Sequence, residues 1–120
     1  MSDRRALQAL DRLIRVREIR ARQAMAAAGC VETRRQAEAA LVARVDRLIA
    51  RDAPGPGPVS AQAASARAAN DAVLGALADR SRSRLAATRS EQAQLAAALA
   101  EARAAVDSAL SRRQQREEMP

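Results

Sequence analysis

The chain has 120 residues, a formal net charge of +7 and a sequence pI near 11.5. All 21 basic residues are Arg, and the chain contains no His, Lys, Phe, Tyr or Trp. This composition excludes an imidazole base or metal ligand, a Schiff-base lysine and an aromatic platform for stacking nucleic-acid bases.

The remaining composition is compatible with both disorder and long helices. Leu, Ile and Val together number 21 residues, or 17.5% of the chain, and less than about 20% with a high net charge is typical of disorder. Ala, Glu, Leu and Arg together number 72 residues, or 60%, and more than about half indicates a coiled coil or a long helix when the sequence is periodic. Periodicity therefore decides between the two.

Residues 3–51 contain no proline and predict a first helix, with Ser2 or Asp3 as its N-cap. With Leu7 taken as heptad position a, ten of the 13 a and d positions are apolar, against 48% of the whole chain. This first seam consists of Leu7, Leu10, Ile14, Arg17, Ala21, Ala24, Ala28, Val31, Arg35, Glu38, Val42, Val45 and Ile49. Leu13, Leu41 and Leu48 widen it at position g.

Residues 52–60 hold three of the four prolines and predict a short loop, because proline removes a backbone donor and clashes with the preceding helical turn. Residues 61–117 predict a second helix capped by Ser60. Its seam is less regular, with six of eight positions apolar: Leu85, Thr88, Gln92, Leu95, Leu99, Ala102, Val106 and Ala109. The Ala-rich run at 61–69 would let two backbones approach closely.

The fold class predicted from these elements is all-α, a single domain in which two long helices form an antiparallel coiled-coil hairpin. A turn at the middle of the loop predicts opposing residues whose numbers sum to about 113, such as Leu7 with Val106, Ile14 with Leu99 and Ala28 with Leu85. The alternative of one continuous parallel dimer conflicts with the three prolines. The many Ala residues in the seam predict marginal stability without a partner.

The most informative charge pattern lies in residues 4–22, which contain seven Arg and two acids. Four of these Arg fall at outward heptad positions b and f. Ile19 is also at f and Val16 is at c, and a solvated surface would not place branched apolar residues there. The candidate partner-binding residues are Arg5, Arg12, Arg15, Val16, Ile19 and Arg22. The alternatives are a merely solvated helix face, or a local seam shift that buries Val16 and Ile19 and exposes Arg17 and Arg20.

Other motifs indicate structure rather than chemistry. Residues 80–84 read Arg-Ser-Arg-Ser-Arg, and we interpret them as a polar helical turn rather than an arginine–serine repeat. The acids lie beside Arg at helical spacing, and no nucleophile has a base nearby, so we expect no enzyme, cofactor, metal site or small-molecule substrate. The single cysteine, Cys30, and the absence of an apolar run of about 20 residues predict a soluble, cytoplasmic protein.

Two short runs carry a resemblance to a known family. Residues 7–13 read Leu-Gln-Ala-Leu-Asp-Arg-Leu and residues 15–22 read Arg-Val-Arg-Glu-Ile-Arg-Ala-Arg. Within a short, Arg-rich helical hairpin without aromatic residues, they resemble the central stalk proteins of type III secretion, the YscO/FliJ group.

The resemblance implies a coiled coil similar to the gamma stalk of rotary ATP synthases, located at the cytoplasmic face of a secretion apparatus. Its terminal end, here residues 4–22 with about 95–117, would enter the pore of the hexameric secretion ATPase. Its loop end, about 45–65, would reach toward the export gate protein. Some members escort export chaperones, and the membrane would be met only through the apparatus.

Two other functions stay open at this point. A pI near 11.5 is typical of a basic nucleic-acid-binding coiled coil, although 14 interspersed acids and the missing basic-zipper signature disfavour it. The third possibility is a generic scaffold or chaperone-like hairpin.

Overall fold

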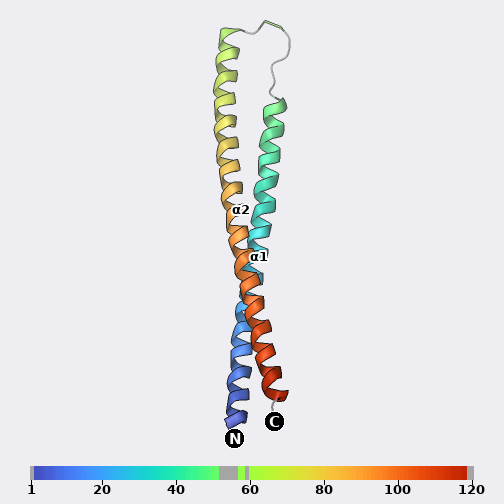
Figure 1. Cartoon of the computed structure of the whole chain (residues 1–120). Helices are drawn as coiled ribbons and strands as arrows, with labels where there is room; N and C mark the ends of the chain where they lie inside the picture. The colour runs from blue at the N-terminus through green and yellow to red at the C-terminus, as the bar shows by residue number, and fades with distance from the viewer. Residues whose placement is uncertain (1, 52–56, 59, 119–120) are drawn as a thin grey trace. The chain divides into compact units, whose positions relative to one another are not determined.

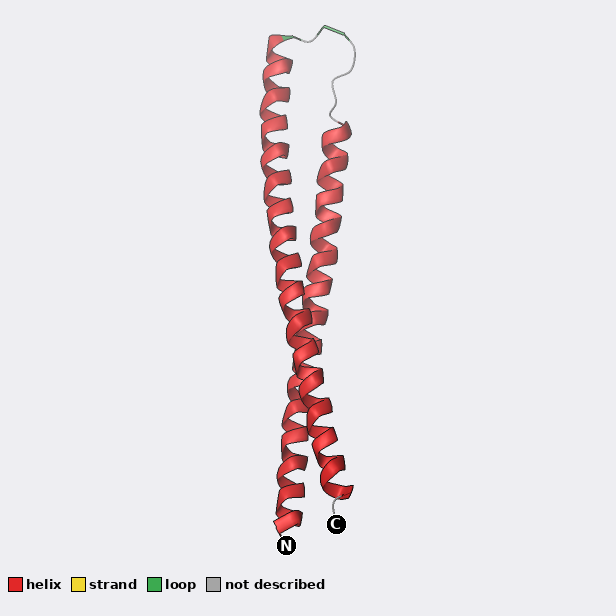
Figure 2. Ribbon diagram, viewed as in Figure 1, coloured by secondary structure: helices red, strands yellow, loops and turns green. Residues whose placement is uncertain are grey.

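The fold is all-α, as predicted. In a computed structural model of the chain, the structure describes residues 2–51, 57–58 and 60–118, and it contains two long helices and no strand in these ranges (Figures 1 and 2). Helix α1 spans Ser2–Arg51 and helix α2 spans Ala61–Glu118. Both agree with the predicted ranges to within one residue at each end. Of the predicted loop 52–60, residues 52–56 and 59 lie outside the described residues.

The start of α2 is capped as the sequence predicts. The backbone N–H of Ala63 donates to Ser60 Oγ at 3.1 Å, which satisfies one of the donors that the first helical turn leaves free. The N–H of Ala64 donates to the carbonyl oxygen of Ser60 at 2.9 Å. At the start of α1, Asp3 lies in the first turn, where its charge is favourable to the helix dipole. The side chain of Ser2 lies outside the described part of the structure.

Contacts divide the chain into two compact units, each built from one section of α1 and one section of α2. The terminal unit combines residues 2–32 with 91–118, and the loop-side unit lies within 33–90. Contacts in the terminal unit join low numbers in α1 to high numbers in α2, so the two sections are antiparallel. Whether the two units behave as one domain stays a prediction.

Each unit has a narrow core along the predicted seam. In the terminal unit the buried apolar residues are Ile14, Val31 and Ala109. In the loop-side unit they are Val45, Ala78 and Leu85. Twelve of the 13 seam positions in α1 are buried or half-buried, and so are all eight in α2; Ile49 is the exception. The heptad prediction of which residues face inward is therefore confirmed for these a and d positions. Of the three Leu predicted to widen the seam, Leu13 and Leu41 are half-buried, but Leu48 is exposed and that prediction is wrong.

One buried residue lies where the sequence predicted only a polar turn. Residues 80–84 are helical, as expected, but Ser81 is 3% exposed and belongs to the seam, between Ala78 and Leu85 at steps of three and four. Its neighbours Arg80 and Arg82 remain exposed. A small hydroxyl residue fits this position because small seam residues allow two helices to approach closely.

The predicted register is wrong by about ten residues. Arg17 Nη1 donates to the carbonyl oxygen of Ala105 at 2.7 Å, and Arg113 pairs with Asp11 at 2.5 Å. These pairs sum to 122 and 124 instead of 113. A sum of 123 brings each seam residue of α1 from Ile14 to Glu38 opposite one of the eight predicted seam residues of α2.

The predicted register assumed that the end of α1 and the start of α2 lie side by side. In the loop-side unit they do not. Leu48 and Arg51 line the same hollow as Asn70 and Leu74, so the end of α1 meets α2 well after its start at Ala61. Residues 61–66 and 68–70 are all exposed, and Figure 1 shows the start of α2 continuing past the end of α1. The expected close backbone approach along 61–69 is therefore wrong, because no described section of α1 lies opposite this run.

A polar residue also interrupts the loop-side core. Glu38 occupies a d position in the seam, and its Oε2 is buried with no hydrogen-bond partner among the described residues. A buried polar atom without a partner costs about 1–3 kcal/mol. The seam therefore contains a residue that reduces the stability of the helix pair.

We predict that Val45→Ala lowers the free energy of unfolding by about 1–2 kcal/mol, because it removes two buried carbon atoms from a side chain that is 1% exposed. The matched control is Val73→Ala, in the same unit, since Val73 is 63% exposed. This control should be neutral or slightly stabilising, because Ala has the higher helix propensity. Urea unfolding followed by far-ultraviolet circular dichroism measures both; equal losses for the two variants would contradict the assigned core.

We predict that Glu38→Leu raises the free energy of unfolding by about 1–3 kcal/mol, because it replaces an unpartnered buried oxygen with an apolar side chain at a seam position. The control is Asp79→Leu, at an exposed position of the same unit, where the change should stay within about 0.5 kcal/mol. The same unfolding measurement applies. A loss of stability in Glu38→Leu would show that the carboxylate makes a favourable interaction.

Candidate protein-docking surface

The predicted partner-binding residues lie together on the outward side of α1 in the terminal unit. We call this surface the basic face and define it as Arg5, Arg12, Arg15, Val16, Ile19 and Arg22, all of which are exposed. Val16 is 45% exposed and Ile19 is 47% exposed. The heptad places these residues at positions b, c and f, opposite the seam, so regular helical geometry alone brings them onto one surface.

The alternative of a local seam shift is wrong. It requires Val16 and Ile19 to be buried and Arg17 to be exposed, whereas Arg17 is half-buried. The Arg17 guanidinium crosses the seam and donates to the carbonyl oxygen of Ala105 on α2. The seam thus keeps its phase through this stretch, and the two branched residues stay on the surface.

Two of the acids near the basic face, Asp3 and Asp11, are engaged elsewhere. Asp11 Oδ1 accepts from Arg113 Nε at 2.5 Å, and Asp3 lies 3.8 Å from an Arg116 nitrogen. Arg113 also pairs with Glu117. The hydrogen bond and charge of Asp11, followed by the charge of Glu117, raise the pKa of Arg113 above its usual value. These ion pairs hold acids at the flanks of the helix pair.

The basic face itself keeps an uncompensated positive charge. Among the described residues, its four Arg form no ion pair with an acid. No acid occupies an outward b, c or f position of α1 from residue 5 to residue 30. The surface is therefore cationic with an apolar centre at Val16 and Ile19, a combination that suits an acidic protein surface with exposed apolar residues.

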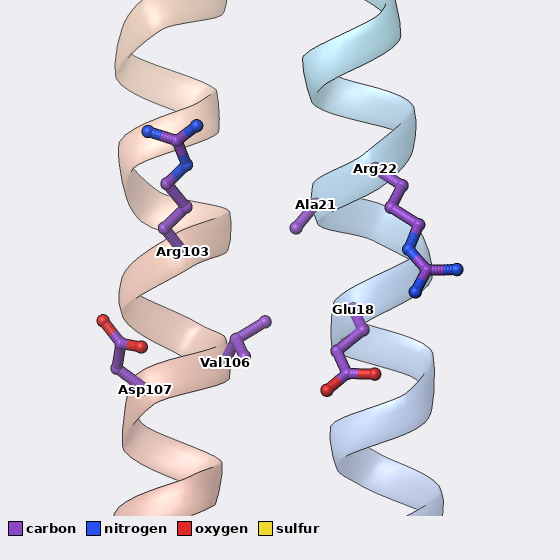
Figure 3. Close-up of a pocket in the computed structure, with 6 residues that line it drawn as sticks. All are labelled: Glu18, Ala21, Arg22, Arg103, Val106 and Asp107. Atoms are coloured by element: carbon purple, nitrogen blue, oxygen red, sulfur yellow. The ribbon is translucent and has the colours of Figure 1, made fainter.

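A shallow hollow of about 280 Å³ lies beside this face, over the seam of the terminal unit. Figure 3 shows Ala21 and Val106 pointing toward each other from the two helices, with charged side chains around them. Space remains because Ala21 is too small to fill the seam. The rim carries two Arg and two acids, namely Arg22, Arg103, Glu18 and Asp107, so the hollow favours neither sign of charge.

The sequence reasoning missed the outward side of α2 in this unit. Glu101, Asp107 and Glu118 lie there, all exposed, and no Arg occupies an outward position of α2 between residues 93 and 118. Continuing the heptad of the predicted α2 seam outward would have identified these positions. The two helices of the terminal unit therefore present outward surfaces of opposite charge.

Groups that carry other kinds of chemistry are not assembled in the described residues. No three Cys, Asp or Glu side chains of this part of the chain come close enough together to hold a metal ion. Cys30 is a free, exposed thiol. Neither described helix is sufficiently apolar over a long enough stretch to span a membrane.

Comparison with known proteins adds no assignment. The chain matches no protein-family model, no curated protein and no solved structure. Its function must therefore be inferred from its own surface and core.

Proposed function

We propose that this protein is a non-enzymatic stalk or adaptor of a type III protein secretion apparatus, which links the hexameric secretion ATPase to the export gate and can escort export chaperones. The observation that carries the proposal is the exposed basic face of the terminal unit. The family resemblance of residues 7–22, which belong to the same unit, supports it. A paired set of long helices with a sparse seam is suited to contact by its surface, not to catalysis.

The dimensions and chemistry of the terminal unit support insertion into a protein ring. Each helix with its side chains is about 10–12 Å in diameter, so an antiparallel pair is about 20 Å across at its widest. Arg suits contacts with acidic subunits because its guanidinium is weakly hydrated and binds carboxylates through two parallel hydrogen bonds. Val16 and Ile19 add an apolar centre surrounded by polar residues, the arrangement of an interface core within a polar rim.

The strength expected of such a contact is modest. Exposed ion pairs contribute about 0.2–1 kcal/mol each, and two half-exposed branched side chains add about 1 kcal/mol each on burial. The ordering of the partners offsets much of this gain. The contact would be weak and reversible, which is what a stalk working through successive subunits of a ring requires.

A linking protein needs a second contact surface, and the loop-side unit has exposed apolar residues of its own. Leu48, Ile49 and Val73 are exposed in this unit. Arg44, Arg47 and Arg51 are also exposed, at helical spacing around Leu48. This surface supports the proposal that the loop side contacts the export gate.

We predict that the wild-type protein stimulates ATP hydrolysis by the cognate secretion ATPase hexamer. We expect Arg12→Glu/Arg15→Glu to raise the protein concentration needed for half-maximal stimulation by about tenfold or more. The reversal turns attraction to acidic subunits into repulsion. The control is Arg80→Glu/Arg84→Glu, which makes the same charge change at exposed positions of the loop-side unit and should leave stimulation unchanged. Steady-state ATPase assays measure all three proteins.

Failure of the wild type to bind or stimulate the hexamer would contradict the proposal. Duplex DNA titrated over a salt series distinguishes the main rival, because several phosphate contacts lose orders of magnitude in affinity between about 50 and 200 mM salt. Salt-dependent DNA binding without hexamer binding would favour a nucleic-acid-binding coiled coil. The acids on the outward side of α2 argue against that outcome, since they would repel phosphates.

A further inference from the structure

The terminal unit carries a second outward surface that the proposed function does not use. We call it the acidic face and define it as Glu101, Asp107 and Glu118 of α2 with the exposed small residues Ala97, Ala100 and Ala104 near them. Its residues occupy the outward heptad positions of α2, since the seam residues Leu99, Ala102 and Val106 are half-buried. Asp107 also borders the hollow that Arg22 lines, and Glu101 borders a second hollow with Arg17 and Arg20 of α1. By its position in the heptad, the acidic face is the counterpart on α2 of the basic face on α1.

The charges of this face are also uncompensated within the chain. Glu101 and Asp107 form no ion pair in the part of the chain that the structure describes, and Glu118 accepts a single long hydrogen bond of 3.5 Å from Gln114. The Arg residues of this section of α2 occupy seam or flanking positions instead: Arg103, Arg112, Arg113 and Arg116. The acidic face is therefore free to pair with a cationic surface.

We infer that the cationic surface it fits is the basic face of a second copy of this chain. In this contact α1 of one copy packs along α2 of the next, and the two contacting helices are antiparallel. The charge signs are complementary along the whole surface, since one face lacks acids and the other lacks Arg. The contact does not rest on the proposed secretion function.

One register brings three Arg of the basic face level with the three acids of the acidic face. With residue numbers summing to 122 or 123, Arg5 is level with Glu118, Arg15 with Asp107 and Arg22 with Glu101. The first two pairs join like heptad positions, f with f and b with b, and so lie directly opposite each other. Arg22 and Glu101 occupy positions b and c, on different sides of the contact, so this third pair adds only longer-range attraction.

The same register also matches side-chain size. It places Ile19 opposite Ala104 and Ala26 opposite Ala97, so the branched residue that protrudes from the basic face meets a small residue of the acidic face. Packing a large side chain against a small one across a helix interface lets the two surfaces interdigitate. Side-chain size is thus compatible with the alignment that the charges favour.

This contact is heterologous, because it joins different surfaces of the two copies. Each added copy leaves one basic and one acidic face uncovered, so association continues beyond a dimer as concentration rises. Since the attraction comes largely from exposed ion pairs, salt weakens it. A bound copy also covers the basic face, so self-association excludes an acidic partner from that surface.

The experiment is sedimentation velocity of the purified chain alone, over a concentration series at about 20 mM and about 0.5 M salt. The wild type should form dimers and larger species at low salt and shift toward monomer at high salt. Arg15→Glu/Arg22→Glu cancels the positive charge of the basic face and places two Glu where it meets the acids of a second copy. Glu101→Arg/Asp107→Arg gives the acidic face a net positive charge, so that it meets the basic face of a second copy with like charge. Each variant alone should associate at least about tenfold more weakly, because attractive pairs become repulsive.

An equimolar mixture of the two variants should recover association, because each then offers a complementary face to the other. This recovery also shows that both variants are folded. The matched control Arg80→Glu/Arg84→Glu should associate like the wild type. A wild type that stays monomeric at low salt, a mixture that does not recover, or a loss in the control equal to that of the face variants would each overturn the inference. No ATPase is present, so the result is independent of the secretion proposal.

Discussion

The narrow seam between α1 and α2 is the constraint on which the other properties of this protein depend. Each section of helix has a single partner section, so only residues along one stripe can be buried, and many of these are Ala. Small residues allow close approach but remove little apolar area from water, and Glu38 adds an unpartnered buried oxygen. With so small a core, most side chains are surface, and the surface must carry the function.

The surface of the terminal unit is organised by the same periodicity that builds the seam. Because the heptad fixes the inward positions, it also fixes the outward ones, which are cationic with an apolar centre on α1 and acidic with small residues on α2. Asp11 and Asp3, which could neutralise part of the basic face, pair with Arg113 and Arg116 at the flanks instead. Both proposed contacts, with a secretion ATPase and with a second copy, follow from this separation of charge.

The helices, the cap at Ser60, the inward positions and the exposure of the basic face could all be predicted from the sequence, since each depends on local spacing. The register could not. Sums of 113 and 123 differ by ten residues, close to three helical turns, so both alignments bring seam positions opposite seam positions. What distinguishes the two alignments is that the last turn of α1 lies beside Asn70 and Leu74, so the first turns of α2 extend beyond the end of α1. Periodicity does not encode this offset. The burial of Ser81 and the unpartnered oxygen of Glu38 are likewise consequences of packing.

The register is the central structural claim, because it determines which charges of the terminal unit lie side by side. It is tested most directly by disulfide formation in a Cys30→Ser background. Ile14→Cys/Ala109→Cys joins two buried positions whose numbers sum to 123, whereas Ile14→Cys/Leu99→Cys joins positions that sum to 113. We expect rapid intramolecular oxidation of the first pair in dilute, non-denaturing solution and little of the second, because a disulfide needs Cα atoms within about 7 Å. Preferential oxidation of the second pair would contradict the account.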